Sequence, residues 1–256
     1  MVVIKSILFL ITVICYFINT APLYPFLFVF PHQTRMLLNY ILSLYTNFTL
    51  FFLNIKIYAN DSVEKIGRGK LIVANHLSYL DILIFASMFR SSFVTSVEIK
   101  NTPFLGQLCQ LAGCLFVERR SRKNLLSEIS EITNSLLAGN NVVVFPEATS
   151  TNGEQVLRFK RPLFRAAREA NTSVIPITIN YHSLENEVVS KENRDLVFWY
   201  GDMTFLDHLL KFFKVKETRV NLIKGQELSF EENDDESTIA QKSFELVRSK
   251  YRPVVS

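Results

Sequence analysis

The sequence predicts an α/β protein with a mixed, largely parallel sheet flanked by helices, preceded by a hydrophobic N-terminal segment of two membrane-anchoring helices. Two observations predict it. Hydrophobic residues make up 48% of the 256 residues, the mean hydropathy is +0.18, and the apolar excess lies in residues 1–53. From Ile55 onward, short apolar runs alternate with amphipathic stretches. We therefore divide the chain into an anchor, residues 1–54, and a catalytic domain, residues 55–256.

The first apolar run, residues 2–18, predicts a helix of about 25 Å, slightly shorter than the hydrocarbon core of a bilayer. A cleaved signal peptide is the alternative, because a lysine precedes the apolar stretch. Asn19 at the −3 place and Pro22 after the cut do not suit cleavage after Ala21. We expect the helix to be retained, with Lys5 reaching the lipid headgroups.

A second long run, residues 36–53, contains no charged residue and predicts a second helix. Between the two helices, residues 23–30 are apolar but contain Pro25, which indicates an interfacial or re-entrant turn. Polar residues recur at helical spacing in the second helix and should face protein or headgroups; they are Asn39, Ser43, Thr46 and Asn47. The alternative is that both helices are buried in a globular domain.

Strands and helices then alternate, which predicts parallel strand pairs joined by right-handed crossovers. The expected strands are residues 71–74, 93–97, 114–118, 142–145 and 173–179. The expected helices are residues 80–89, 103–112, 122–138 and 162–170. The third of these has apolar residues on one face and ends before Gly139, a common C-terminal signal.

The C-terminal part predicts a smaller set of elements. Residues 196–200 and 216–223 should be strands, with a short helix, residues 205–213, between them. The acidic residues 231–236 indicate a solvated loop, and residues 237–251 a closing amphipathic helix.

A histidine and a carboxylate stand five residues apart where the first predicted strand meets the helix after it. Ser78 can cap that helix, which places Asp81 in its first turn, where the helix dipole favours a carboxylate. Asp81 can then reach back to His76. An imidazole held by a carboxylate on one nitrogen presents the other as a general base. The alternative is a surface or structural histidine.

Charge and cysteine content narrow the function further. The net charge is only +4, but basic residues cluster at residues 119–123 and 158–161, which favours anionic ligands or lipid headgroups. No nucleic-acid recognition motif accompanies these clusters, so we expect no nucleic-acid partner. The three cysteines, Cys15, Cys109 and Cys114, have no metal-binding spacing. We expect no metal and a reduced, cytosolic location for the main domain.

Four sequence blocks resemble, in order and spacing, those of the glycerolipid acyltransferase family, whose best-known members are the 1-acylglycerol-3-phosphate acyltransferases. They are Asn75-His76 followed by Asp81, GCLFVER at residues 113–119, FPEAT at residues 145–149 and VIPI at residues 174–177. The resemblance covers about residues 60–180, and the hydrophobic N-terminus is also similar to bacterial members.

The resemblance implies transfer of a fatty acyl chain from acyl-CoA or acyl carrier protein to the free hydroxyl of a lyso-lipid, first of all 1-acylglycerol-3-phosphate. His76 would be the base and Asp81 its orienting partner. The implied partners are membrane lipids and the two substrates, with no further cofactor, at the cytoplasmic side of the inner membrane. The expected substrate-binding residues, with Arg119 and Lys160 on the acceptor's anionic group, are Gly113, Phe116, Arg119, Pro146, Glu147, Thr149 and Lys160.

The third block departs from the family pattern, which reads Phe-Pro-Glu-Gly-Thr and then arginine. Ala148 replaces the glycine, so we expect a turn that avoids positive φ, and Ser150 replaces the arginine. The departure leaves a lyso-ornithine lipid or lysophospholipid acceptor open, as well as a non-catalytic lipid-binding protein. A thioesterase that uses water is a further alternative.

A covalent intermediate on Ser78 or Cys114 is the mechanistic alternative to direct attack by the acceptor. We favour direct attack, since the chain has no G-x-S-x-G motif. Backbone N–H groups near the start of the helix after Ser78 could then stabilise the oxyanion.

Overall fold

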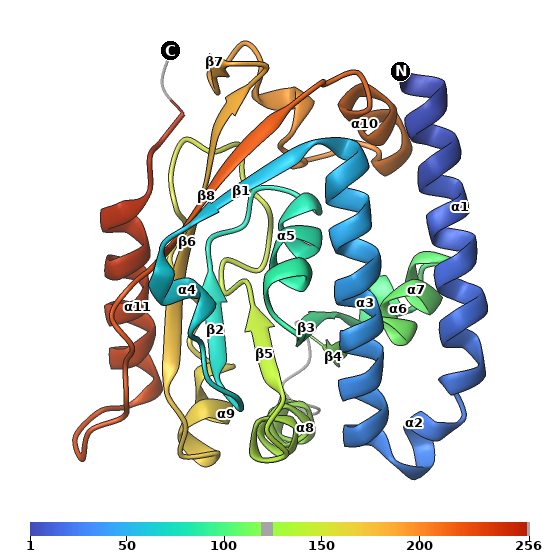
Figure 1. Ribbon diagram of the computed structural model, residues 1–256. Coiled ribbons are helices and arrows are strands. Elements are labelled where there is room, and N and C mark those ends of the chain that lie inside the picture. Colours follow the sequence, from blue (N-terminus) through green and yellow to red (C-terminus); the bar gives the residue numbers. More distant parts are fainter. Residues whose placement is uncertain (119–124, 255–256) are drawn as a thin grey trace.

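In the computed structural model, which describes residues 1–118 and 125–254, helices pack around one mixed sheet (Figure 1). This confirms the predicted fold class. The sheet has eight strands in the order β1-β8-β6-β2-β5-β3-β4, with β7 beside β6. The strands are β1 Ile55–Ala59, β2 Leu71–Ala74, β3 Ser91–Ser96, β4 Leu115–Val117, β5 Asn141–Val144, β6 Val174–Leu184, β7 Glu187–Val188 and β8 Thr218–Lys224.

The centre of the sheet is parallel. β2 pairs in parallel with β5 and β6, and β3 pairs in parallel with β5 and β4. β6 is antiparallel to β7 and β8, while β8 is parallel to β1. All four residues of β2 are fully buried, as expected for a parallel strand covered on both faces.

Helices cover the sheet in two groups. α5 (Leu80–Met88) packs against α3 (Pro31–Leu53), and α3 packs against α1 (Val2–Thr20). α9 (Phe164–Glu169) contacts α8 (Leu125–Leu137) and α11 (Glu236–Lys250), and α11 lies along β6. The connection from β2 to β3 runs in one direction along the sheet, whereas those from β4 to β5 and from β5 to β6 run in the other. Because such crossovers are right-handed, α5 lies on one face of the sheet and α8 and α9 lie on the other.

Short elements complete the fold. Two of them, η1 (Ala21–Leu23) and α2 (Phe26–Val29), form the predicted turn between α1 and α3, and α2 exposes Phe26 and Phe28. The others are α4 (Asp61–Glu64), α6 (Val97–Lys100), α7 (Leu105–Leu111), η2 (Arg194–Leu196) and α10 (Phe205–Phe212).

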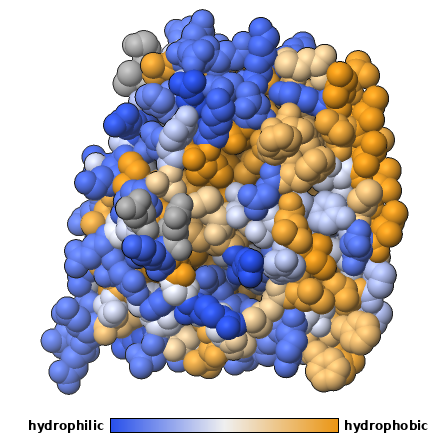
Figure 2. All heavy atoms as spheres, in the orientation of Figure 1, coloured by the Kyte–Doolittle hydropathy of each residue, from blue (hydrophilic) through white to orange (hydrophobic). Residues whose placement is uncertain are grey.

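The two N-terminal helices present apolar side chains outward and polar side chains inward. Three residues of the predicted polar stripe on α3, Asn39, Ser43 and Thr46, are buried, while the fourth, Asn47, is exposed. Figure 2 shows the apolar side chains as an orange column over α1 and α3. Both helices are long and apolar enough to cross a membrane. By itself this is weak evidence, since core helices and signal sequences share these properties.

The expectation that Lys5 reaches the headgroups is wrong. Lys5 is only 6% exposed, and its Nζ donates hydrogen bonds to the backbone carbonyls of Val215, at 2.6 Å, and Leu53, at 3.4 Å. Further along α1, the hydroxyl of Tyr16 donates to the carbonyl of Leu111 at 2.8 Å. These contacts hold α1 against the main domain, because a buried ammonium group requires acceptors.

One strand prediction failed, and the strands β1 and β7 were not predicted. Residues 196–200 are not a strand: Leu196 ends η2, and the N–H of Trp199 donates to the carbonyl of Leu77 at 2.9 Å. Their apolar pattern reflects burial over the loop after β2, since Val197 and Phe198 are at most 1% exposed. The edge strand β1 was not predicted, although its residues alternate between Ile or Ala and Lys or Tyr.

Candidate active site

The loops that follow β2 and β5 carry the candidate active site. β2 and β5 are adjacent and parallel, with Val73 opposite Val144, so their carboxyl ends lie at the same edge of the sheet. His76 follows β2 and Glu147 follows β5. In α/β sheets this edge is the usual place for ligand binding.

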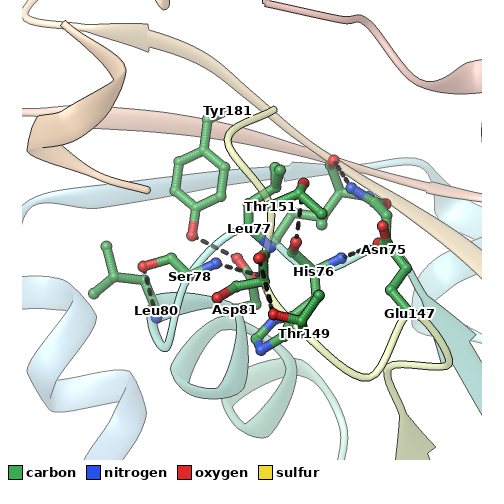
Figure 3. Close-up of polar contacts among 12 residues, drawn as sticks. Asn75, His76, Leu77, Ser78, Leu80, Asp81, Glu147, Thr149, Thr151 and Tyr181 are labelled. Atoms are coloured by element: carbon green, nitrogen blue, oxygen red, sulfur yellow. Dashed lines mark hydrogen bonds and ion pairs between the residues drawn. The ribbon is translucent and has the colours of Figure 1, made fainter. Parts of the chain in front are cut away.

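His76 and Asp81 form the predicted pair (Figure 3). Nδ1 of His76 lies 2.9 Å from Oδ2 of Asp81. The same Oδ2 accepts the backbone N–H groups of Leu77, at 2.7 Å, and Ser78, at 3.0 Å. Asp81 is fully buried at the start of α5, so its carboxylate is fixed and can orient the imidazole.

Tyr181 is a residue of this site that the sequence did not reveal. Its hydroxyl donates to Oδ1 of Asp81 at 2.7 Å. Burial first, and then the charge of Asp81, raise the pKa of Tyr181 well above its usual value, so the hydroxyl remains a donor. Tyr181 lies on β6, 100 residues from Asp81 in the chain. A signal was the alternation of Ile175, Ile177, Ile179 and Tyr181, which continues beyond the end of the predicted strand at residue 179.

The imidazole of His76 packs against an aromatic ring but remains partly exposed to solvent. Its ring stacks on Phe145, with the centroids 4.2 Å apart and the planes 14° from parallel. The side chain is 17% exposed. No side chain among residues 1–118 and 125–254 forms a hydrogen bond to Nε2, the nitrogen opposite the one held by Asp81.

Glu147 braces the loop that carries His76. Its Oε1 accepts the backbone N–H of His76 at 2.8 Å, and its Oε2 accepts the N–H of Leu157 at 2.7 Å. Burial raises the pKa of Glu147 to about 7, and the charge of Asp81 adds to this increase, while the two N–H donors oppose it. Glu147 is 3% exposed, so the structure places it as a link between two backbone segments.

The turn at the third block differs from expectation. Ala148 adopts a positive φ of 61°, and its N–H donates to the carbonyl of Phe145 at 3.0 Å. The prediction that alanine excludes this conformation is wrong. The left-handed region is a small allowed region for residues with a Cβ, at a cost of roughly 1–2 kcal/mol, and the surrounding hydrogen bonds hold the turn.

The helix start after Ser78 also differs in detail. The N-cap of α5 is Tyr79 rather than Ser78, although the Ser78 hydroxyl accepts the N–H of Leu80 at 3.4 Å. The N–H groups of Leu77 and Ser78 are directed at Asp81. The N–H groups of Leu77 and Ser78 therefore position the pair, and the N–H of Leu80 is bonded to Ser78, so all three donors are engaged within the protein.

The predicted substrate-binding residues that the structure describes form no single cluster. Pro146 is buried, and its carbonyl accepts the N–H of Lys160 at 3.0 Å, while the side chains of Lys160 and Thr149 are exposed. Phe116 is half-buried on β4, with Nζ of Lys100 5.4 Å from its ring centroid.

Gly113 and Arg119 flank β4. Gly113 ends α7 at a φ of +69°, where a Cβ would lie 2.9 Å from Oδ1 of Asn39, so α3 requires glycine there. Arg119, which the resemblance assigns to the acceptor's phosphate, lies outside the described residues.

Comparisons with known proteins identify relatives of this chain. A sequence model of the acyltransferase family matches residues 54–180. The chain is 31% identical over 197 residues to a lyso-ornithine lipid O-acyltransferase of Brucella abortus, covering 73% of this chain and 74% of that protein. It is 29% identical over 181 residues to a 1-acyl-sn-glycerol-3-phosphate acyltransferase of Neisseria gonorrhoeae, covering 71% and 69%.

The fold has a solved counterpart. The crystal structure of the 1-acyl-sn-glycerophosphate acyltransferase PlsC from Thermotoga maritima matches with a TM-score of 0.60 over 96% of this chain and 95% of that one. At 18% identity this similarity concerns the fold. The family match and the relatives above lead to one conclusion: the chain belongs to the glycerolipid acyltransferase family.

Proposed function

We propose that this protein transfers a fatty acyl chain from a thioester, acyl-CoA or acyl carrier protein, to the free hydroxyl of a lyso-lipid. The observation that carries the proposal is the His76–Asp81 pair, with Nδ1 held at 2.9 Å and the imidazole partly exposed at the carboxyl edge of β2. The pair supplies a base for the hydroxyl, and an acyl transfer of this kind needs no further cofactor.

In the proposed reaction, Nε2 of His76 takes the proton from the acceptor hydroxyl as its oxygen attacks the thioester carbonyl. The new C–O bond forms, the C–S bond breaks, and the imidazolium returns the proton to the leaving thiolate. Asp81 stabilises the imidazolium without taking its proton. A general base of this kind contributes about 10²- to 10⁴-fold in rate.

Direct attack by the acceptor agrees with the burial of the two candidate nucleophiles. Ser78 is fully buried, and its hydroxyl oxygen accepts the N–H of Leu80. Cys114 is 8% exposed, and its hydrogen bond with Cys109, followed by burial, raises the pKa of its thiol well above the usual value. A thiol with a raised pKa is a poor nucleophile.

The acceptor is proposed to be 1-acylglycerol-3-phosphate, giving phosphatidic acid, with Arg119 and Lys160 on its phosphate. Guanidinium and ammonium groups suit that ligand. A lyso-ornithine lipid is the second candidate. It is supported by Ser150, an uncharged residue where the family pattern has arginine, and by the similarity to the Brucella protein. Gly113, Phe116, Pro146 and Thr149 would shape the acceptor site.

The outward apolar faces of α1 and α3 support a membrane location, which we propose to be the cytoplasmic side of the inner membrane. Residues 1–54 would anchor the protein, and residues 55–256 would carry the reaction. A lyso-lipid in the bilayer could then reach the site without leaving the membrane surface.

An acceptor panel tests this function. The purified protein in detergent or vesicles receives a radiolabelled acyl thioester together with lysophosphatidate, lysophosphatidylethanolamine or lyso-ornithine lipid. Label should appear in the diacyl product of one acceptor, and the preferred acceptor decides between the two candidates. Label released as free fatty acid whether or not acceptor is present would indicate a thioesterase. Lipid binding without turnover on any acceptor would indicate a non-catalytic protein.

A further inference from the structure

A cavity of about 530 Å³ lies between the loop after Glu147 and the C-terminal half of α11; we call it the α11 cavity. Val156 and Leu157 line it from the loop, and Phe244 and Tyr251 line it from α11 and the segment that follows. Its volume falls in the range of small-molecule sites, which are typically mostly apolar with a few polar groups.

The polar groups of the α11 cavity carry positive charge. Arg158 and Arg248 line it, both are exposed, and within the described part of the chain neither forms a salt bridge. Glu154 is the one carboxylate among the described lining residues, and Nη1 of Arg194 binds it at 2.8 Å, which lowers the pKa of Glu154. Two guanidinium groups beside an apolar wall suit a phosphate ester joined to an uncharged organic group.

Hydrogen bonds connect the cavity wall to the active site. The N–H of Leu157 donates to Glu147, and the other carboxylate oxygen of Glu147 accepts the N–H of His76. The hydroxyl of Tyr251 donates to the carbonyl of Gly153 at 2.7 Å. Gly153 has a φ of +83°, and a Cβ there would lie 2.3 Å from the ring of Phe198, so the turn is closely packed. The cavity wall is therefore fixed relative to His76.

The sheet order separates this cavity from β4, the strand that precedes Arg119 in the sequence. β2, which leads to His76, lies between β6 and β5. α11 packs along β6, on one side of β2, whereas β4, which leads to Arg119, lies beyond β5 and β3 on the other side. His76 must meet two anionic substrates. Lys160, the other residue proposed to hold the acceptor's anion, lies beside Pro146 after β5, which is also on the β4 side of β2. The α11 cavity is therefore available to the donor.

We propose that the α11 cavity binds the phosphate-bearing carrier arm of the acyl thioester, with Arg158 and Arg248 on the phosphate. This inference rests on the proposed acyl transfer. Coenzyme A and acyl carrier protein both present the thioester at the end of a phosphopantetheine arm, so the phosphodiester is common to the two donors. The apolar wall contacts the organic part of the arm.

The test is the double variant Arg158→Gln/Arg248→Gln, with Arg165→Gln/Arg168→Gln as its matched control. The control removes the same two charges from exposed positions on α9. Steady-state rates are measured with acyl-CoA, with acyl carrier protein and over a range of acceptor concentrations. We expect KM for the thioester to rise about tenfold or more in the cavity variant, because two charge-assisted contacts are lost, with kcat and the acceptor KM within about twofold of the parent.

A rise in KM with either thioester supports the proposal and identifies that carrier as the donor. An increase confined to the acceptor KM, or unchanged thioester KM values, overturns it. Calorimetric titration with phosphopantetheine separates this test from the proposed function, since it requires no turnover. The parent and control should bind this probe more tightly than the cavity variant, and equal binding by all three would refute the site. Matching melting temperatures establish that the variants fold.

Discussion

At the residue scale, the carboxylate of Asp81 is the most heavily coordinated group of the site. It accepts hydrogen bonds from two backbone N–H groups and from Tyr181, and it holds Nδ1 of His76. Buried charged groups require such partners. The positions of both carboxylate oxygens are thereby determined, and with them the direction of the imidazole.

Replacing Tyr181 by phenylalanine removes one of these donors without changing the shape of the side chain. We expect the free energy of unfolding to fall by about 1–3 kcal/mol, because a buried charge loses a hydrogen bond. We expect kcat to fall roughly tenfold, the equivalent of about 1.4 kcal/mol in the barrier. The acidic limb of the kcat/KM profile should move to higher pH, because a carboxylate with fewer donors stabilises the protonated imidazole more strongly.

Tyr58→Phe is the matched control for this variant, since Tyr58 is 52% exposed on β1. A purely structural role for Tyr181 would lower stability and leave the pH–rate profile in place. That outcome would contradict the assignment of Tyr181 as a positioning residue.

The raised pKa of Glu147 predicts that the stability of the protein depends on pH. Burial raises its pKa from 4.5 to about 7, so between these values the folded protein binds more protons at this site than the unfolded chain. The contribution of Glu147 to the free energy of unfolding therefore falls by roughly 3 kcal/mol as the pH rises through this window. Above the window it is constant. Chemical denaturation of Glu147→Gln at intervals from pH 4.5 to 8 should lack this decrease.

Glu245→Gln, at an exposed position on α11, is the control and should retain the parent's slope. Parallel stability curves for the parent and Glu147→Gln would contradict the raised pKa. Activity is a second measurement: glutamine offers one acceptor where two N–H groups need one each, so the loop that carries His76 should loosen and kcat should fall.

Local sequence predicted part of this site and missed the rest for a physical reason. His76 and Asp81 face each other because five residues span one strand-to-helix turn, a geometry set by the segment itself. Tyr181 reaches Asp81 from another strand, so only tertiary structure brings them together. The positive φ of Ala148 was missed for the same reason, since hydrogen bonds elsewhere in the loop hold it.

At the scale of elements, α1 buries polar side chains and exposes apolar ones, the opposite of a surface helix in a soluble protein. Its buried residues include Lys5, Thr12 and Tyr16, whereas Ile7, Ile11 and Ile14 are between 48% and 52% exposed. In water such a face is unfavourable, and large exposed apolar patches usually mark an interaction site. A lipid bilayer would bury it.

The outward face of α1 can be tested with Ile7→Gln/Ile11→Gln/Ile14→Gln. Burying each isoleucine in lipid is worth roughly 1.5–3 kcal/mol, so the triple variant should be recovered largely in the soluble fraction when it is floated with lipid vesicles. Thr12→Ser, on the inward face, is the control and should float like the parent. Equal flotation of the triple variant would show that α1 does not contact the bilayer.

Secondary structure was predictable where the spacing of apolar residues matches the face that is buried. The helix at residues 122–138 was predicted, and within its described part, α8, Ile129, Ile132 and Leu136 are buried. Residues 196–200 were predicted as a strand because they are apolar, but they pair with no strand, and Val197 and Phe198 are buried against the loop after β2. The spacing of apolar residues alone cannot distinguish a buried strand from a buried segment that pairs with no strand.

At the scale of the whole molecule, strand order was not predictable from the sequence. β1 pairs with β8, although residues 55 and 218 are far apart in the chain, and β8 runs antiparallel to β6 within an otherwise parallel centre. Such pairings depend on contacts between distant segments. They determine the arrangement on which the account rests, with β2, which leads to His76, between β4 and the strand that α11 packs along, β6.

The most direct test of the central claim is the rate of acyl transfer by His76→Ala, measured with the preferred thioester and acceptor. His182→Ala is the matched control, because His182 is exposed on β6. If His76 is the base, its variant should lose about 10²- to 10⁴-fold in kcat while it still floats with vesicles, and the control should retain the parent rate. Near-normal turnover by a folded His76→Ala protein would contradict the account.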